Sequence, residues 1–221
     1  MNPSQLLDRY VGVVMAASAT QSLTGARDAE EFRERHVVDA QKLLEIISEK
    51  KSAATTQVLD IGSGNGIPGI VFAILQPDWR ISLLDSNNKK ALFLESFCNS
   101  NDIKNVSVLC DRAETLAHKK ELRSTFDIVV ARALSKLPVA IEVAAPFLKL
   151  NGFLIVPHGT SHQEELDRSE KAMKAVGVVL KEKRAYKLDS GQEFTALIFQ
   201  KETDTPDIYP RRVGVPDKRP L

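Results

Sequence analysis

The sequence predicts an α/β protein built on a mostly parallel sheet that ends in an antiparallel hairpin. Short apolar runs alternate with helical stretches from residue 57 onward, an order that is typical of parallel strands joined by right-handed crossovers. Two later apolar runs are separated only by residues 188–192, so they must pair antiparallel. Four of the eleven glycines cluster within residues 62–69, directly after the first apolar run. Such clustering indicates a sharp turn that a ligand can approach closely.

The composition is that of a folded globular chain. The 221 residues are 43% hydrophobic and 27% charged, which argues against a mainly disordered, collagen-like or coiled-coil protein. The net charge of +1 does not indicate a nucleic-acid partner, although local basic clusters still could. Cys98 and Cys110 are too few for a disulfide framework or a four-thiolate zinc site. No apolar run approaches the roughly 20 residues that span a bilayer. We therefore expect a cytoplasmic protein with no metal and no membrane partner.

Residues 1–52 are expected to form an N-terminal helical extension. Its first helix has apolar residues at helical spacing, namely Leu6, Tyr10, Val13, Val14 and Ala17. A second helix follows Asp28, which can cap it in a capping box with Glu31. The apolar stripe of this helix consists of Phe32, His36, Ala40, Leu43, Leu44 and Ile47. Residues 51–56 are small and polar and are expected to be a linker.

Residues 53–202 have the pattern of one α/β domain. The strands are expected at 57–61, 80–84, 106–109, 126–131, 152–156, 178–187 and 193–200. The helices between them are expected at 67–76, 88–100, 112–120, 135–148 and 162–176. The last two strands form the antiparallel hairpin.

Residues 203–221 form a third segment, a C-terminal arm rich in proline and arginine. Four of the ten prolines lie here, so we expect neither regular helix nor central strand. One interpretation is a frayed tail. The other is an extended arm whose basic residues, among them Arg211, Arg212 and Lys218, dock on the body of the protein or on a polyanion.

The loop from Asp60 to Gly69 carries the strongest functional signal. It reads Asp-Ile-Gly-Ser-Gly-Asn-Gly-Ile-Pro-Gly. Three of its glycines, the second to the fourth, satisfy the dinucleotide fingerprint G-x-G-x-x-G, which keeps an NAD(P)-dependent oxidoreductase open as an alternative. An acid followed by Gly-x-Gly-x-Gly, here Asp60 with Gly62, Gly64 and Gly66, resembles instead the first motif of class I S-adenosylmethionine-dependent methyltransferases. Their Rossmann-like sheet has the same parallel order and antiparallel end.

Acidic residues follow the next two strands. Asp85 stands at the end of the second strand, where a carboxylate can accept hydrogen bonds from both ribose hydroxyls of either cofactor class. Ala113 and Glu114 follow the third strand, at the position that faces the adenine in methyltransferases. Asp85 can also be a helix cap, and Glu114 can also be an acid favoured at a helix start.

Motifs along nearly the whole chain resemble one methyltransferase family. They comprise Ser22-Leu23-Thr24, Arg27-Asp28, Arg35-His36-Val37-Val38-Asp39, the loop from Asp60 to Ile70, Asp85-Ser86, Lys89-Lys90, Phe93-Leu94, Arg112-Ala113-Glu114, Phe126-Asp127, Ala131-Arg132-Ala133 and Leu137. The ending Tyr209-Pro210-Arg211-Arg212-Val213-Gly214-Val215-Pro216-Asp217-Lys218-Arg219-Pro220-Leu221 is the most specific of them. With these residues the chain resembles the ribosomal RNA small-subunit methyltransferase G family, also called glucose-inhibited division protein B.

This resemblance implies methylation of guanine N7 in 16S ribosomal RNA with S-adenosyl-L-methionine. It implies cofactor contacts at Gly62, Ile67, Ala113, Glu114 and Arg132, with Asp85 on the ribose. From the loop itself we also expect cofactor contacts at Gly64, Gly66 and Asp60, whose carboxylate can hold the ammonium group directly or through water. The expected partner is 16S ribosomal RNA or the small ribosomal subunit, and the protein is expected to be a monomer. A non-catalytic ribosome-assembly factor with the same fold is a further alternative.

The expected chemistry needs no general base, because guanine N7 carries a lone pair and no proton. Alignment and exclusion of water can then suffice. The fourth strand leads into Ala131-Arg132-Ala133, without the Asn/Asp-Pro-Pro-aromatic motif of amino-group methylation and without a cysteine for C5 chemistry. Arg132 is expected to orient a ligand, since its guanidinium can face the cofactor carboxylate, an RNA phosphate or guanine O6. A plain surface arginine is the alternative.

We expect RNA contacts at the fifth strand and in the C-terminal arm. The family usually has Lys-Gly after the fifth strand, whereas this chain has His158-Gly159, so His158 is the expected replacement. In the arm the expected RNA-binding residues are Arg211, Arg212 and Lys218, because phosphates require positive charge. The competing role of the arm is a structural clasp across the core.

Overall fold

A computed structural model describes residues 1–50, 55–159 and 162–221. In that part of the chain one seven-stranded sheet has the order β3-β2-β1-β4-β5-β7-β6. The strands are β1 (Gln57–Ile61), β2 (Arg80–Asp85), β3 (Val106–Cys110), β4 (Phe126–Ala131), β5 (Leu148–His158), β6 (Val178–Lys187) and β7 (Glu193–Lys201). The pairs among β1 to β5 are parallel, and β7 pairs antiparallel with both β5 and β6. The predicted fold class is confirmed.

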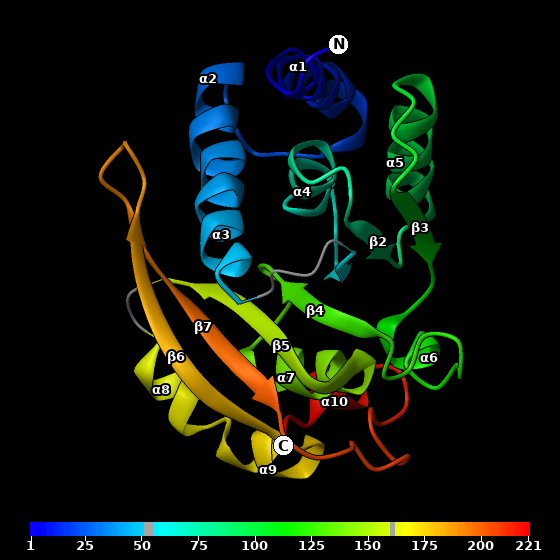
Figure 1. Cartoon of the computed structure of the whole chain (residues 1–221), viewed down its shortest axis with the longest axis vertical. Coiled ribbons are helices and arrows are strands. Elements are labelled where there is room, and N and C mark those ends of the chain that lie inside the picture. The colour runs from blue at the N-terminus through cyan, green and yellow to red at the C-terminus, as the bar shows by residue number, and fades with distance from the viewer. Residues whose placement is uncertain (51–54, 160–161) are drawn as a thin grey trace.

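Helices cover both faces of the sheet (Figure 1). On one face lie α1 (Pro3–Gln21), α2 (Ala29–Phe32), the π-helical segment η1 (Arg33–Val38), α3 (Asp39–Ser48), α4 (Gly69–Leu75) and α5 (Asn88–Ser100). On the other lie α6 (Ala113–Leu116), α7 (Leu137–Ala144), the short 3-10 turn η2 (Ala145–Phe147), α8 (Gln163–Asp167), α9 (Glu170–Val176) and α10 (Val215–Lys218). The N-terminus and the C-terminus lie on opposite sides of the sheet.

Each strand therefore supplies two hydrophobic cores. Successive side chains of a strand point to opposite faces, so Val58 joins the core under α1, α3 and α4 while Leu59 and Ile61 join the core over α7. Asp60 shares the face of Val58 and is buried there. The alternation thus places one carboxyl group inside an otherwise apolar layer.

The N-terminal extension packs against the sheet and the glycine loop. Tyr10 of α1 is fully buried, and its hydroxyl donates a 2.8 Å hydrogen bond to the carbonyl of Asn65 in the glycine loop. Helices α1 and α3 both contact α4. The extension therefore supports the loop from behind. The expected boundary between residues 52 and 53 and residues 51–54 of the expected linker 51–56 lie outside the described residues.

The expected capping box is only half formed. The Asp28 carboxylate accepts from the Glu31 amide at 2.8 Å, as expected. The Glu31 carboxylate, however, accepts from the amide and the Nε of Arg27, at 2.8 and 2.9 Å. An ion pair with a guanidinium offers this carboxylate a stronger partner than the cap amide. The expected continuous helix also contains the π-helical segment η1.

Two expected helices are shorter or broken. Only α6 forms within 112–120, because the chain turns after Leu116 and the Ala117 carbonyl accepts from Arg123 Nη1 at 3.0 Å. The helix expected at 162–176 splits into α8 and α9. Ser169 lies at the break and donates from its hydroxyl to the carbonyl of Glu165 at 2.6 Å, which competes with the regular helical pattern.

The expectation of no helix in the C-terminal arm is wrong for one turn. Residues Val215–Lys218 form α10, and Pro216 lies in its first turn, where the missing N–H of proline costs nothing. Gly214 precedes the helix with φ 75°, a conformation that favours glycine. Proline is thus accommodated because the helix consists of little more than that first turn.

Candidate active site

A cavity of about 300 Å³ lies at the carboxyl ends of β1, β2, β3 and β4. In open parallel sheets, this edge is where ligands bind. Its lining includes Gly62, Asp85, Ala113, Glu114 and, from the C-terminal arm, Asp217. The cavity therefore joins four of the predicted cofactor-binding residues to one residue that we did not predict.

The glycine loop is tied to the end of β2 through Asp85. Gly64 donates its amide to Asp85 Oδ2 and Asn87 donates its amide to Oδ1, each at 2.8 Å. Gly64 has φ 59° and Gly62 has φ 72°, so both occupy a conformation that a side chain would strain. Asp85 therefore holds the loop in place while its carboxylate, with two lone pairs on each oxygen, still faces the cavity.

Asp60 lies beneath the loop with an unusual carboxyl group. Its Oδ2 accepts from the amide of Gly69 at 3.0 Å. Its Oδ1 is buried and has no hydrogen-bond partner among the described residues. Burial raises the pKa of Asp60 to about 7, against the opposing effects of the Gly69 amide and of the Arg132 charge. An unsatisfied buried oxygen of this kind is an acceptor that fits a donor group of a ligand.

Glu114 closes the opposite end of the cavity. Its Oε1 accepts from the Gly214 amide at 3.0 Å and from Arg112 Nη2 at 3.3 Å. Burial raises the pKa of Glu114, but the hydrogen bonds from Gly214 and Arg112 outweigh it and lower the pKa below its usual value. A carboxylate is thus held beside Ala113, at the position predicted to face adenine.

The remaining loop residues predicted to bind the cofactor do not line this cavity. Gly66 and Ile67 belong to the turn behind it, where the Ile67 amide donates to Asn65 Oδ1 at 3.3 Å. A Cβ on Gly66 would lie 2.7 Å from side-chain atoms of Ile70 and Leu94. The structure thus gives Gly66 a packing role, and the cofactor contacts expected at these two residues remain predictions.

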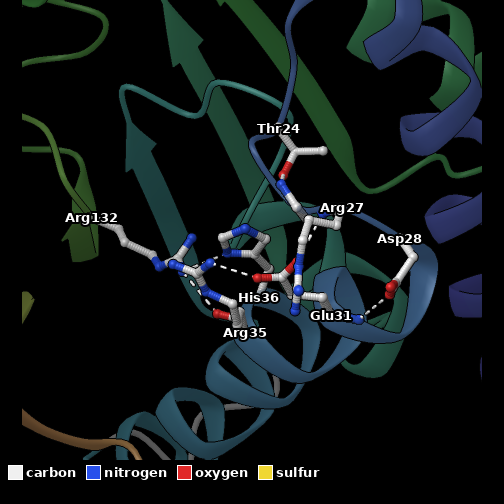
Figure 2. A network of polar contacts seen from close by, with 8 residues as sticks. Thr24, Arg27, Asp28, Glu31, Arg35, His36 and Arg132 are labelled. Carbon is white, nitrogen blue, oxygen red and sulfur yellow. Dashed lines mark hydrogen bonds and ion pairs between the residues drawn. The ribbon is translucent and has the colours of Figure 1, made fainter.

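Arg132 lies in a second cavity, of about 370 Å³, between the N-terminal helices and the ends of β4 and β5. Its Nε lies 2.9 Å from Asp39 Oδ2, and Nη2 donates to the Arg35 carbonyl at 3.2 Å and to His36 Nδ1 at 2.9 Å. Figure 2 shows its guanidinium pointing at η1. With 21% of its side chain exposed, Arg132 is not the plain surface residue of the alternative interpretation.

Asp39 and His36 hold this arginine from two sides. Asp39 is almost fully buried, and its Oδ1 accepts from the Tyr186 hydroxyl at 2.7 Å. Burial, followed by the charge of Arg132, lowers the pKa of His36 to about 4. His36 is therefore neutral near pH 7, and its Nδ1 accepts rather than donates. Glu31, which bridges Arg27 and Arg35, extends the network along the helix (Figure 2).

The four predicted RNA-binding residues do not lie together. His158 lines the second cavity, and its Nε2 is 3.5 Å from Glu165 Oε2. Arg212 and Lys218 are exposed. Arg211 instead pairs with the fully buried Glu142, donating from Nη2 at 2.6 Å and from Nε at 2.9 Å. Its guanidinium is thus engaged inside the protein.

Asp39, Asp217 and Phe194 line these cavities although no role was predicted for them. Asp39 belongs to a quoted motif, but nothing in the sequence shows that it meets Arg132 across 93 residues. Asp217 and Phe194 reach the first and the second cavity through the docking of the arm and of β7. Only tertiary structure brings such distant residues together, so no local pattern could have identified them.

The described residues contain neither a candidate metal site nor a helix that could span a membrane. Over 1–50, 55–159 and 162–221, no group of three or more His, Cys, Asp or Glu side chains could hold a metal ion. In the same ranges no helix is both long enough and apolar enough to cross a bilayer.

Comparisons with known proteins agree with this geometry. Residues 3–192 match the sequence profile of a family described as rRNA small subunit methyltransferase G. The chain is similar to proteins named ribosomal RNA small subunit methyltransferase G from Thermotoga sp. (strain RQ2), 39% identical over 97% of this chain and 90% of the relative, and from Moorella thermoacetica, 36% identical over 100% and 92%.

Solved structures show the same fold. The structure of an O-methyltransferase from Bacillus cereus in complex with SAH matches with a TM-score of 0.63, covering 87% of this chain and 91% of that one, at 14% identity. At that identity the likeness concerns the fold alone. Sequence similarity of this extent, on a class I methyltransferase fold, shows that the chain belongs to the rRNA small subunit methyltransferase G family and uses S-adenosylmethionine.

Proposed function

We propose that the chain transfers a methyl group from S-adenosylmethionine to N7 of a guanine in 16S ribosomal RNA. The main support for this proposal is that the two cavities share a wall, formed by Ala133, Leu134 and Ser135. A cofactor in the first cavity and a flipped-out base in the second then meet at this wall. Extrusion of the target base into a pocket is the usual way for an enzyme to reach a base.

The first cavity fits the cofactor. In its lining, Asp85 provides an acceptor for ribose hydroxyls, and the segment at Ala113 and Glu114 for adenine. Asp60 does not line the cavity, but its unsatisfied Oδ1 lies beneath the adjoining glycine loop, where its charge favours an ammonium group. When bound, the cofactor supplies an electrophilic methyl group. The protein's contribution is to hold the two partners in line and to exclude water.

The second cavity supports a reaction without a general base. Its three candidate bases all have partners: His36 accepts from Arg132, Asp39 is bound by Arg132 and Tyr186, and His158 Nε2 lies 3.5 Å from Glu165 Oε2. Guanine N7 requires no proton removal, because its lone pair attacks the methyl group directly. Methylation of an exocyclic amine would require a proton acceptor, and each of these three groups is already engaged by another side chain.

Arg132 is suited to orient the base. Asp39, His36 and the Arg35 carbonyl engage its Nε and Nη2, whereas Nη1 has no hydrogen-bond partner among the described residues. A guanidinium nitrogen can donate to guanine O6, which neighbours N7. We therefore assign Arg132 the orienting role and Asp39 the role of positioning Arg132.

Basic residues on the edge of the sheet are paired with acids of the same chain. On the edge strand β6, Lys181 pairs with Glu202 at 2.5 Å and Arg184 with Glu49 at 2.6 Å. These ion pairs lower the positive potential that phosphates would meet. Among the residues predicted to bind RNA, Arg212 and Lys218 of the arm are the exposed cations, so we assign phosphate contacts to them.

The test is methyl transfer by the purified chain to small subunits that lack the modification. Mass spectrometry should detect 7-methylguanosine at one site of the 16S RNA. Asp39→Asn should lower the rate of transfer about tenfold, the effect of weakening one charged hydrogen bond, with affinity for S-adenosylhomocysteine unchanged. Asp189→Asn, in the exposed hairpin turn, is the matched control.

Other outcomes would reject the proposal. Methylation of an adenine, a ribose or an exocyclic amine would overturn the N7 assignment. Tight RNA binding without any transfer would favour a non-catalytic assembly factor. Binding of a nicotinamide cofactor in place of S-adenosylhomocysteine would favour an oxidoreductase.

A further inference from the structure

The first cavity is lined in part by the C-terminal arm. Asp217 of α10 reaches its lining, and the Asp217 Oδ1 accepts from the hydroxyl of Ser135 at 2.7 Å. Ser135 belongs to the wall between the two cavities. The other oxygen, Asp217 Oδ2, has no hydrogen-bond partner among the described residues. A residue near the end of the chain thus bridges the arm and the wall beside which the cofactor binds.

A second contact fixes the adenine end of the same cavity. The Gly214 amide donates to Glu114 Oε1 at 3.0 Å. With φ 75°, Gly214 turns the arm so that its amide faces Glu114. Removing the arm would therefore leave Glu114 with Arg112 as its one side-chain partner in the described chain, and would leave the carboxylate free to rotate.

Anchors outside the cavity hold this part of the arm. Arg211 donates from its amide and its guanidinium to the buried Glu142, at 2.6 to 2.9 Å, and from Nη2 to the Arg219 carbonyl at 2.8 Å. Arg123, in the turn between α6 and β4, donates to the carbonyl of Tyr209 at 3.0 Å. None of Arg211, Glu142 and Arg123 lines the cavity. Contacts outside the cavity therefore hold the arm on both sides of the segment that contains Gly214 and Asp217.

We propose that residues 211–219 form a fixed wall of the S-adenosylmethionine pocket, with Asp217 and Gly214 as determinants of cofactor binding. This inference rests on the methyltransferase function and adds to it a part played by the arm. An acceptor oxygen at the cavity suits a cofactor that carries donors on its ammonium, ribose and exocyclic amine. If the docked arm binds the cofactor better than a displaced arm does, then cofactor binding must stabilise the docked position of the arm by the same free energy.

A point variant with a matched control tests the wall. Asp217→Ala should raise the dissociation constant of S-adenosylhomocysteine about tenfold in calorimetric titration, as expected for loss of a hydrogen-bond acceptor. Asp207→Ala removes an acid of the same arm whose side chain is 99% exposed and lies outside the cavity. It should leave the dissociation constant within about twofold of wild type, a change below ordinary experimental significance.

A truncation and a protection experiment test the linkage. A chain that ends at Val213 keeps the Arg211–Glu142 pair and loses Gly214 and Asp217, so it should bind S-adenosylhomocysteine more weakly than Asp217→Ala does. In the full chain, S-adenosylhomocysteine should slow tryptic cleavage after Arg212 and Lys218. Normal binding by both variants, with unprotected cleavage, would overturn the proposal and leave the arm as a clasp.

The proposed function can fail separately. If the full chain binds S-adenosylhomocysteine in an Asp217-dependent manner and transfers no methyl group to guanine, the wall stands and the assigned reaction falls. If the chain that ends at Val213 binds S-adenosylhomocysteine like the full chain and guanine is methylated, the reaction stands and the wall falls.

Discussion

At the scale of single residues, the protonation of Asp60 should be coupled to cofactor binding. The pKa of its buried carboxyl is raised to about 7, so about half of the free protein carries it protonated near neutrality. A cofactor with an ammonium and a sulfonium group favours the ionised carboxylate. Binding should therefore release a proton, and affinity should rise between about pH 6 and pH 8, on either side of the Asp60 pKa of about 7.

Calorimetry in two buffers of different ionisation enthalpy measures this release directly. The wild-type chain should release a fraction of one proton per cofactor below pH 7, and Asp60→Asn should release none. A matched control is Asp78→Asn, an exposed acid in the turn before β2. Proton release that persists in Asp60→Asn would assign the linked titration to another group.

At the scale of elements, the helix η1–α3 carries a pH-dependent contribution to stability. The pKa of His36 is lowered to about 4 in the folded chain, against about 6.5 in an unfolded one. Between these values the unfolded state binds more protons, so the contribution is full above pH 6.5 and is lost as pH falls towards 4. The charged groups that face His36 are Arg132, Arg35 and Glu31, and of these the two arginines oppose its protonation.

His36→Gln removes this titration and keeps a side chain that can accept from Arg132. The difference in unfolding free energy between wild type and variant should therefore shrink as pH falls from about 7 to 5. Asp60 has the opposite slope in this window, because its folded pKa is raised. It is common to both proteins and cancels in the difference. A constant difference across the window would show that His36 is not the titrating group.

The bounds of several strands could be predicted from the sequence. The strands expected at 57–61, 126–131 and 178–187 form with those bounds, because alternation against two cores leaves little freedom of placement. The strand expected at 152–156 extends to Leu148–His158, with a shift of register around Gly152, whose Cβ would approach the Asp127 carbonyl at 3.0 Å. Such irregularities depend on neighbouring strands and leave no local periodic signal.

The site was predictable to the extent that its residues lie in one motif. Asp60, Gly62 and Asp85 follow strands of a recognisable order, so their convergence at one edge of the sheet was foreseeable. The placement of Arg132 was not, because it depends on Asp39 of α3, which lies 93 residues earlier in the chain. The partner of Arg211 was not predictable either, because the sequence gives no sign that Glu142 is buried and pairs with a cation 69 residues later in the chain.

At the scale of the whole molecule, the C-terminal arm combines a structural role with a proposed RNA-binding role. Different cations of the arm serve the two roles. Arg211 pairs with fully buried Glu142, and breaking such a pair leaves an uncompensated buried charge that costs about 3 kcal/mol or more. Arg211→Ala should therefore lower the melting temperature markedly. Glu142→Gln with Arg211→Gln, which removes both charges, should restore part of it. The cations of Arg212 and Lys218 have no such partner inside the described chain.

Arg212→Ala and Lys218→Ala should leave the melting temperature unchanged and weaken RNA binding. Each phosphate contact contributes about one unit, or somewhat less on single strands, to the dependence of log affinity on log salt. The double variant should therefore reduce this slope by about two, whereas Arg211→Ala, measured below its melting temperature, should leave the slope intact. If Arg211→Ala reduced the salt dependence of RNA affinity and the double variant did not, the phosphate contacts would have to be assigned to Arg211 instead of Arg212 and Lys218. This result would mean that the arm releases Glu142 and presents Arg211 when RNA binds.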